Sequence, residues 1–295
     1  MHIAHATPAR PDEATIRIGG LPQPVTLLHI TDSHLTEVDA RDPAIVDAAE
    51  QRRRTFAALS PGGIAPRTHF HQALARCRAL AADAVILTGD IIDFPSAANL
   101  ELVEAALAAT GLPYLFTLGN HDWHFPHLVW SAETRTRLYP RFAGLTAGHP
   151  AYQARDLGGL RLVTIDNSTY QVSPEQLAFL RAELASGRPC LLFMHIPLYV
   201  PSLAPAVVAK FAAPIMLAAP GWTAETQAAW HVHDAEVSTQ ACYELLTEGA
   251  VENLVGIFCG HVHFAHVDAF GEGRMQYVTR PGFEGGYRVI RLLPG

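Results

Sequence analysis

Five short clusters of aspartate, asparagine and histidine are spread through the sequence, and each directly follows an apolar run. One is a tight turn, Gly119-Asn120-His121-Asp122, which comes after the apolar residues 114–118. Glycine at such a position lets the backbone turn sharply and approach its neighbours closely. An amide, an imidazole and a carboxylate crowded together after it are suited to a metal or catalytic centre. The other clusters are Asp32 with His34, Asp90 followed by Asp93, His195, and His261 with His263.

The apolar runs indicate strands, so the clusters are expected where those strands end. In open α/β sheets ligands bind beyond the carboxyl ends of strands, and clusters distant in sequence can therefore converge. Asp32 with His34, and His261 with His263, have i, i+2 spacing, which in an extended backbone directs both side chains to one face. Three carboxylate or amide oxygens and four imidazoles are too many for a single tetrahedral metal. This set favours two metals that share a bridging carboxylate and keep open positions for water and substrate.

Each cluster alone also has an ordinary structural interpretation. Asp-x-His and Gly-Asp are frequent in capping loops and turns. A single histidine after an apolar run, such as His195, is more often a hydrogen-bonded core residue. Five clusters in order, each at the end of an apolar run, are not explained by turn chemistry. We therefore interpret them together as a metal centre.

The elements that must carry the clusters follow from the spacing of apolar residues. Strands are expected at 15–20, 25–30, 84–87, 114–118, 160–165, 190–194 and 251–258. Helices are expected at 43–59, 70–82, 97–110, 174–185 and 238–248. Residues 264–293 alternate in the manner of two or three antiparallel strands. No linker is evident, which favours one domain over residues 1–295 with cap or loop excursions at 36–68 and 198–237.

Composition excludes several classes of function. The chain has 295 residues, 49% of them hydrophobic, and a formal net charge of −7, so it lacks the cationic surface for tight, non-specific nucleic-acid binding. A small anionic substrate is still allowed if bound cations neutralise it locally. No apolar run of about 20 residues predicts a membrane span, and residues 1–12 lack the features of a secretory signal. Four scattered cysteines without a Cys-x-x-Cys pair favour a reduced, cytoplasmic setting.

The ordered clusters resemble the motifs of the calcineurin-like metallophosphoesterase superfamily over roughly residues 25–265. The matching series is Asp32-x-His34, Gly89-Asp90-x-x-Asp93, Gly119-Asn120-His121-Asp122, His195 and Gly260-His261-x-His263. The resemblance implies a four-layer αββα sandwich, an α/β fold, with a dinuclear site at its centre. It also implies that Asp32, His34 and His263 hold one metal, that Asn120, His195 and His261 hold the other, and that Asp90 bridges them. Mixed nitrogen and oxygen ligation suits manganese, iron or zinc.

The resemblance implies catalytic rather than ligand roles for His121 and Asp93. His121 lies beside the leaving group in the family, oriented by the acid that matches Asp93, and a protonated His121 could act as general acid after in-line attack by a metal-bridging hydroxide. Purple acid phosphatases have a tyrosine ligand where this chain has Asp93, so a tyrosinate–iron site is not expected. Asp122 is usual in the family and is interpreted as support for the site, as a cap of the turn, or as both.

In the superfamily that the chain resembles, loops rather than the metal site determine which substrate is bound. No substrate-binding residue is assigned from the sequence. Three segments could supply such loops: 36–68, 123–142 and 198–237. Arg52-Arg53-Arg54 in the first is typical of a solvated helix face, with a lid over an anionic substrate as the alternative. Side chains that could stack on a base or contact a phosphate are Trp123, His124, Trp222, Trp230, His231 and His233. Trp222 and Trp230 could also simply pack a long loop.

The motif layout is similar to that of bacterial cyclic-nucleotide phosphodiesterase-like members. A small phosphodiester is therefore the expected substrate, with phosphomonoesterase activity as the runner-up. A non-catalytic scaffold of the same fold would have lost ligands, and none is lost here. A nuclease acting on polymers is disfavoured by the acidic net charge and the absence of a basic stripe.

Overall fold

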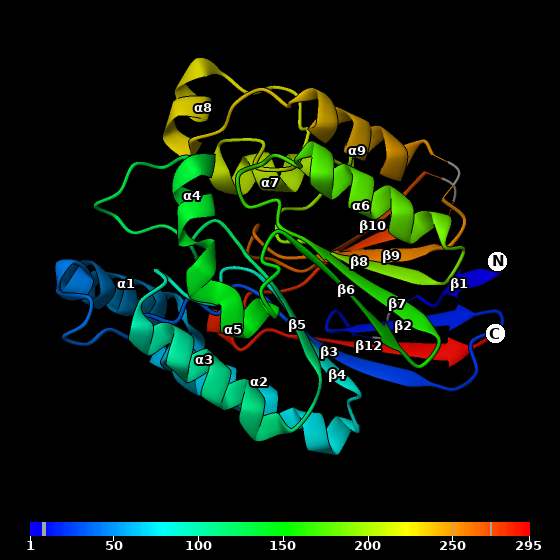
Figure 1. Cartoon of the computed structure of the whole chain (residues 1–295), viewed down its shortest axis with the longest axis horizontal. Coiled ribbons are helices and arrows are strands. Elements are labelled where there is room, and N and C mark those ends of the chain that lie inside the picture. Colours follow the sequence, from blue (N-terminus) through cyan, green and yellow to red (C-terminus); the bar gives the residue numbers. More distant parts are fainter. Residues whose placement is uncertain (8–9, 250, 272) are drawn as a thin grey trace.

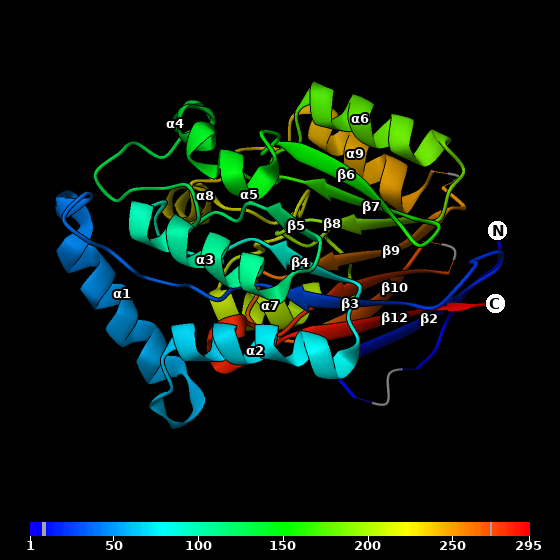
Figure 2. The same ribbon diagram turned by 60° about the horizontal axis from the view of Figure 1, so that its bottom comes forward.

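Two six-stranded sheets packed face to face form the centre of the computed structural model, which describes residues 1–7, 10–249, 251–271 and 273–295 (Figure 1). The strand orders are β1-β2-β12-β3-β4-β5 and β10-β11-β9-β8-β7-β6. Helices cover the outer face of each sheet, as the two views in Figures 1 and 2 show. The predicted four-layer αββα sandwich is therefore confirmed.

The first sheet carries three parallel strands whose ends approach one another. Its strands are β1 (Ile3–His5), β2 (Glu13–Ile18), β12 (Arg288–Pro294), β3 (Val25–Ile30), β4 (Ala84–Thr88) and β5 (Tyr114–Thr117). The strands β3, β4 and β5 run parallel, with Leu28 beside Val85 and Ile86 beside Leu115. Helices α2 (Pro66–Leu80) and α3 (Ala97–Thr110) pack on the outer face, while α1 (Val46–Leu59) lies beyond the ends of these strands (Figure 2).

The second sheet supplies the other two strands that lead to the clusters. Its strands are β10 (His266–Phe270), β11 (Arg274–Val278), β9 (Leu254–Cys259), β8 (Cys190–Phe193), β7 (Leu160–Ile165) and β6 (Tyr152–Leu157). Helices α6 (Pro174–Ala185) and α9 (Val237–Thr247) cover its outer face (Figure 1). The helix α6 begins at Pro174 because the Ser173 side chain accepts from the Gln176 N–H while the Gln176 side chain accepts from the Ser173 N–H.

The described residues of the core shared by the two sheets include none from a helix. Leu27 and Ile86 of the first sheet meet Leu191, Phe193 and Phe258 of the second, and all five side chains are buried. The rings of Phe193 and Phe258 stack with centroids 5.4 Å apart. Strands covered on both faces become continuous apolar runs in sequence, which is why β4, β8 and β9 were recognisable.

Most predicted elements are found at or near their expected positions. The helix expected at 70–82 begins earlier, at Pro66, because proline is well accommodated in the first helical turn. The strand expected at 251–258 begins at Leu254. Elements that the sequence did not indicate are β1, β6, α4 (Ala132–Leu138), α5 (Ala143–Thr146), α7 (Ala204–Phe211) and α8 (Ala224–Trp230).

The expectation for residues 264–293 is only partly right. The strands β10 and β11 pair antiparallel in the second sheet. The strand β12 instead joins the first sheet, antiparallel to β3 and parallel to β2. Alternation of apolar and polar residues identifies a strand but not the sheet that it joins, which explains the difference. Glu272, within this stretch, lies outside the described residues.

The two predicted excursions lie at the end of the sandwich where β3, β4 and β5 finish. Residues 36–68 contain α1, and residues 198–237 contain α7 and α8 (Figure 1). Within the described part of the chain, no helix has the length and apolar character needed to cross a bilayer. The cysteines Cys77, Cys190, Cys242 and Cys259 are all buried as free thiols.

Candidate metal centre

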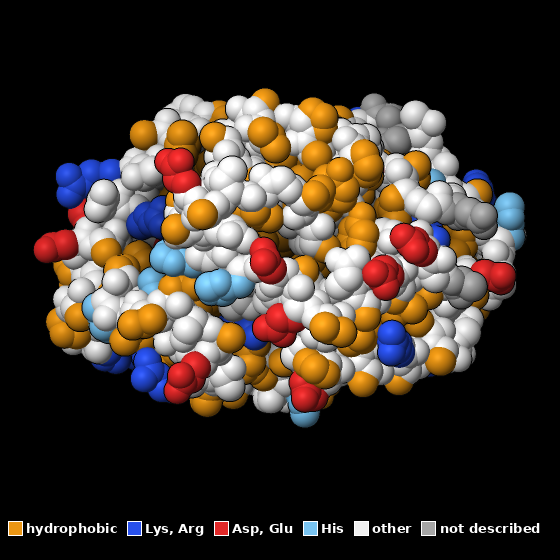
Figure 3. Space-filling view, turned by 90° about the horizontal axis from the view of Figure 1, so that it is seen from above, with side chains coloured by type: hydrophobic (Ala, Val, Ile, Leu, Met, Phe, Trp, Pro, Cys, Tyr) orange, Lys and Arg blue, Asp and Glu red, His pale blue; other side chains and the backbone are white. Residues whose placement is uncertain are grey.

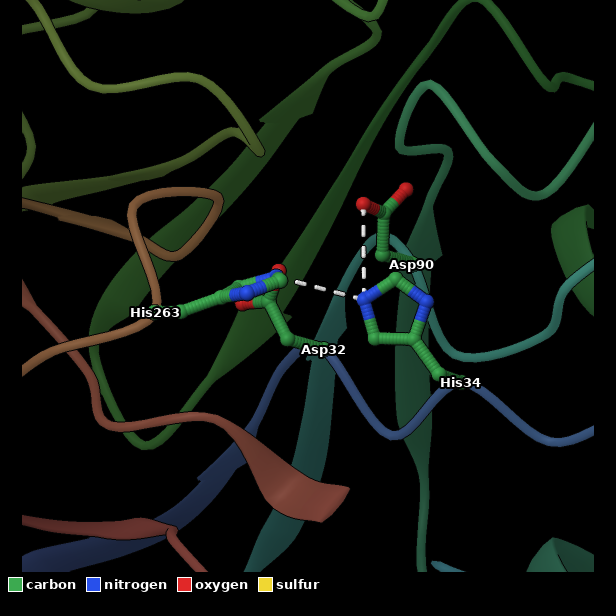
Figure 4. A group of neighbouring side chains, drawn as sticks. All are labelled: Asp32, His34, Asp90 and His263. Carbon is green, nitrogen blue, oxygen red and sulfur yellow. Dashed lines mark hydrogen bonds and ion pairs between the residues drawn. The ribbon is translucent and has the colours of Figure 1, made fainter. Parts of the chain in front are cut away.

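The five polar clusters meet beyond the ends of β3, β4, β5, β8 and β9. One group of ligand atoms, all within 4.8 Å of one another, comes from Asp32, His34, Asp90 and His263. In Figure 4 these four side chains point toward one another from three separate segments of the chain. A second group of the same kind comes from Asp90, His195 and His261. Asp90 therefore belongs to both groups.

In the first group, two imidazole nitrogens point toward each other. His34 Nε2 lies 3.2 Å from His263 Nε2 and 3.9 Å from Asp90 Oδ2. His263 Nε2 lies 3.3 Å from Asp32 Oδ1. Two nitrogens and two carboxylate oxygens thus surround one point, as expected of ligands for a transition-metal ion.

The second group is completed by Asn120. His195 Nε2 lies 3.2 Å from Asp90 Oδ2, 3.1 Å from Asn120 Oδ1 and 3.2 Å from His261 Nδ1. The structure therefore brings together all seven side chains that the sequence suggested as ligands. His195 is also hydrogen-bonded and fully buried, so the simpler interpretation of a core histidine describes it correctly but incompletely.

Three of these histidines are held by a hydrogen bond through the ring nitrogen that faces away from the cluster. His34 Nδ1 donates to Asp93 Oδ1 at 2.9 Å, and His195 Nδ1 donates to the Thr88 carbonyl at 2.8 Å. His261 Nε2 lies 2.7 Å from the Tyr170 hydroxyl, so its Nδ1 is the nitrogen that faces inward. Metal-binding histidines are typically held in this way through the nitrogen that does not bind the metal.

The charge of the pocket also fits a cation. Burial lowers the pKa of His195, but the carboxylates of Asp90 and Asp32 outweigh this effect and raise the pKa to about 9. Burial together with the neighbouring His195 lowers the pKa of His261 well below its ordinary value. The pocket thus attracts positive charge, which a divalent ion supplies more completely than one proton.

Asp90 has a different partner for each of its oxygens. Oδ1 accepts the backbone N–H of His121 at 2.8 Å. Oδ2 is the oxygen that faces both groups, toward His195 on one side and His34 on the other. One carboxylate oxygen directed at two neighbouring groups is an arrangement that suits a shared ligand.

The backbone that carries the paired ligands is not extended, so the i, i+2 argument for a common face is wrong. The φ angles are 50° at Asp32, 47° at His34, 70° at His261 and 51° at His263, all in the left-handed region. The N–H groups of Asp32 and His34 donate to carbonyls of the loop after β4 at 3.0 and 2.9 Å. The side chains converge because left-handed turns direct them inward, at a cost of roughly 1–2 kcal/mol for each such residue.

Gly119 is required for close approach rather than for a special backbone angle. Its φ does not fall in the left-handed region. A methyl group on its Cα would overlap the carboxylate and backbone nitrogen of Asp90. The close approach expected at Gly119 is therefore confirmed, and it does not depend on a left-handed backbone angle.

Asp122 ties the ends of β4 and β5 together. Its Oδ2 accepts the N–H groups of Gly119 and Asp90 at 2.5 and 2.7 Å, and its Oδ1 accepts the Ile92 N–H at 3.0 Å. Burial, followed by the adjacent Asp90, raises the pKa of this carboxyl to about 8. Asp122 is thus both a turn cap and a support for Asp90.

Asp93 contacts two histidines through one oxygen. Its Oδ1 lies 2.9 Å from both His34 Nδ1 and His121 Nδ1. The contact between Asp93 and His121 was expected from the sequence, whereas the contact between Asp93 and His34 was not. Burial by itself would lower the pKa of His121, but Asp90 and Asp93 outweigh it and raise that pKa.

Two further residues lie at the site. The sequence gave no signal for Tyr170, and it indicated Arg52 only as part of the arginine triplet 52–54, for which a lid over an anionic substrate was the alternative to a solvated helix face. Tyr170 lies in the turn after β7, with a positive φ of 61°, and reaches His261 across the second sheet. Arg52 of α1 places its Nε 3.7 Å from Asp93 Oδ2 and its Nη2 3.4 Å from His121 Nδ1. Neither residue lies in a motif, because its contact is created by packing between elements distant in sequence.

The tryptophans suggested as stacking groups have mainly structural surroundings. Trp123 is fully buried and donates to the Ser168 hydroxyl at 3.0 Å, so the suggestion that it stacks on a substrate is wrong. Trp222 and Trp230 pack against the core on the outer face of the second sheet, as the simpler interpretation expected. The Trp230 ring nevertheless lies 6.5 Å from that of His261, close to the metal centre.

The histidines in the same set are more accessible. His124 is half-buried and lines a cavity beside His121. His231 is exposed and stacks on Trp130 with ring centroids 5.3 Å apart. His233 is exposed, and its carbonyl accepts a hydrogen bond from Gln171.

Comparisons with known proteins agree with this geometry. Residues 25–265 match the model of a family described as calcineurin-like phosphoesterase. A probable cyclic nucleotide phosphodiesterase of Rhodococcus erythropolis is 30% identical over 196 residues, which are 62% of this chain and 56% of that protein. A cAMP/cGMP dual specificity phosphodiesterase of Mycobacterium tuberculosis is 28% identical over 194 residues, which are 62% of this chain and 53% of that protein. The chain thus spans about half the length of the curated relatives that it matches.

A solved structure supports the fold independently. A dimetal phosphatase from Danio rerio superposes with a TM-score of 0.57 at 14% identity, covering 90% of this chain and 91% of the other. The family match includes every strand end that contributes a ligand atom, from β3 to β9. The chain therefore belongs to the calcineurin-like phosphoesterase family.

Proposed function

We propose that this chain is a dinuclear metal-dependent hydrolase of small phosphodiesters such as cyclic nucleotides. The observation that carries the proposal is the single Asp90 oxygen that faces two separate histidine groups. The choice of diesters is supported by the activities named for the two curated relatives. Phosphomonoester hydrolysis is the alternative activity for the same site.

Each metal position has its own ligands in this proposal. Asp32, His34 and His263 bind the first ion, and Asn120, His195 and His261 bind the second. Asp90 is shared by both. Neutral imidazoles with carboxylate and amide oxygens suit manganese, iron or zinc.

The protein side chains then position the ester and move its protons. When bound, a pair of divalent ions activates water near neutral pH and neutralises charge on the phosphoryl oxygens. Asp93 accepts the Nδ1 proton of His121, which leaves His121 Nε2 to donate a proton to the departing oxygen. Burial would raise the pKa of Asp93, but His34 and His121 keep it lowered, so Asp93 stays an acceptor throughout.

Replacing Tyr170 with phenylalanine is expected to weaken metal binding by roughly 10- to 100-fold, because the variant loses the hydroxyl that orients His261. The measurement is calorimetric titration of the metal-free protein with Mn²⁺ or Zn²⁺. Tyr152→Phe is the matched control, since Tyr152 stacks on Phe179 away from the site. Equal metal affinities for Tyr170→Phe and the wild type would contradict the assigned role.

Two chromogenic substrates separate the proposed activity from its alternative. With Mn²⁺ bound, kcat/KM is expected to be higher for bis-(p-nitrophenyl) phosphate than for p-nitrophenyl phosphate, and 3′,5′-cyclic AMP should be opened. A clear preference for the monoester would replace the proposed activity with that of a phosphomonoesterase. Failure to cleave either ester while two ions per chain are bound would contradict hydrolase function.

A further inference from the structure

A cavity of about 490 Å³ lies directly beside the His121 side chain. The helix α1 contributes Gln51, Arg52 and Thr55 to the lining, which also includes Phe94, Asn120 and Trp130. This volume falls within the range of small-molecule sites. On the face shown in Figure 3, histidine side chains gather next to Lys and Arg at the side where Figure 1 places α1, α4 and α8.

Only one of the three consecutive arginines in α1 faces this cavity. Arg53 donates to the Glu50 carboxylate at 2.7 Å and to the Thr36 carbonyl at 2.9 Å. Arg54 donates to Glu50 at 3.1 Å, and its side chain is 74% exposed. Arg52 lines the cavity instead. Arg53 and Arg54 thus form hydrogen bonds on the surface of α1, whereas Arg52 faces the cavity.

Among the described residues, the Arg52 guanidinium donates no hydrogen bond to an oxygen acceptor. Its Nε is 3.7 Å from Asp93 Oδ2, too far for a hydrogen bond. Its Nη2 is 3.4 Å from His121 Nδ1, but that nitrogen donates to Asp93 and cannot also accept. Among the described residues, Asp93 Oδ2 likewise accepts no hydrogen bond. Charge attraction therefore holds Arg52 in place while its fork of N–H groups stays available to a ligand.

The Trp130 ring in the lining packs against other aromatic rings. Trp130 lies 4.6 Å from Trp123 and stacks on His231 at 5.3 Å, both between ring centroids. No aspartate or glutamate lines the cavity within the described part of the chain, and Arg52 is its one Lys or Arg side chain. Such a cavity matches a ligand with an apolar or aromatic body and an anionic group at one edge.

We propose that this cavity receives the leaving group of the ester, and that Arg52 selects leaving groups with an anionic substituent, a carboxylate or a phosphate. The inference rests on the proposed function, because His121 is the group assigned to protonate the departing oxygen and it lines the same cavity. A planar guanidinium binds either anion through two parallel hydrogen bonds, which a neutral substituent of similar shape does not provide. Arg52 is then a specificity-determining residue.

The test compares three methyl aryl phosphodiesters whose phenol carries a carboxylate, a phosphonate or a neutral carboxamide at the para position. Arg52→Gln is expected to lower kcat/KM for the anionic substrates by about 10-fold or more relative to the carboxamide. Arg54→Gln, its neighbour on α1, should leave that ratio unchanged. The carboxylate and phosphonate arms show which anion the cavity prefers. Arg52→Lys keeps the charge without the fork and should retain part of the preference.

Three outcomes would count against this inference in different ways. If Arg52→Gln retains metal content and melting temperature and the anionic-to-neutral ratio is unchanged, the leaving-group pocket is refuted while the hydrolase proposal stands. If the wild type cleaves none of the three diesters with two ions bound, the proposed function itself fails, and the inference fails with it. If Arg52→Gln does not fold, an unchanged ratio in Arg52→Lys together with a neutral preference in the wild type refutes the role of Arg52.

Discussion

Replacing Asp90 with alanine is expected to empty both metal positions and to reduce phosphodiester hydrolysis by about 10³-fold or more. The reason is that Asp90 Oδ2 faces His195 and His34 together, so one substitution removes a ligand from each group. The loss should exceed the roughly 10²–10³-fold typical of removing a single charge-stabilising donor. Elemental analysis of the purified protein, alongside kcat/KM for bis-(p-nitrophenyl) phosphate, measures both effects.

Two variants make the Asp90 result interpretable. Asp47→Ala removes an exposed carboxylate from the first turn of α1 and should change neither metal content nor rate. Asp90→Asn keeps an oxygen that can accept the His121 N–H, and it should still lose metal because the negative charge is gone. Full occupancy of two ions in Asp90→Ala would refute the shared-ligand role.

The His121→Ala variant is expected to keep both metals and to lose about 10²–10⁴-fold in rate on an alkyl phosphodiester. Its side chain contacts Asp93 but belongs to neither of the two ligand groups that include Asp90. A p-nitrophenyl leaving group departs without a proton, so the loss on bis-(p-nitrophenyl) phosphate should be much smaller. The two losses are measured as kcat at saturating Mn²⁺, with metal content determined on the same samples.

Comparing the rate losses on the two esters distinguishes loss of a general acid from damage to the metal centre. An equal loss on both esters would indicate a disturbed metal centre, and a wild-type rate on the alkyl ester would show that His121 is not the acid. His149→Ala is the matched control, because His149 is exposed and contributes to neither ligand group.

The strand ends and their polar clusters could be predicted because both leave a local mark in the sequence. A strand buried on two faces, such as β4, appears as a continuous apolar run, and the residue after it is then a known position in space. The ordered series of clusters adds the information that these positions converge. The sequence therefore led to seven side chains that the structure brings together, even though the extended backbone assumed for two pairs was wrong.

Contacts that arise from packing between distant elements could not be predicted in the same way. Tyr170 meets His261 only after β7 and β9 take their places in the second sheet. The sequence alone could not distinguish Arg52 from Arg53 and Arg54. Helical periodicity places the three side chains on different sides of α1, but it does not indicate which side of the helix faces the site. The short edge strand β6 is only partly buried and so lacks an apolar run.

The left-handed backbone at the proposed metal ligands has a consequence for thermal stability. Asp90, with a φ of 50°, shares this conformation with the two ligand pairs, and these unfavourable backbone angles weaken the metal-free protein. An ion that binds only the folded chain is expected to offset this weakness, by about 2.7 kcal/mol for each site when its free concentration is 100 times the dissociation constant. The melting temperature should accordingly rise with free metal in the buffer, so that the ions behave as removable parts of the scaffold.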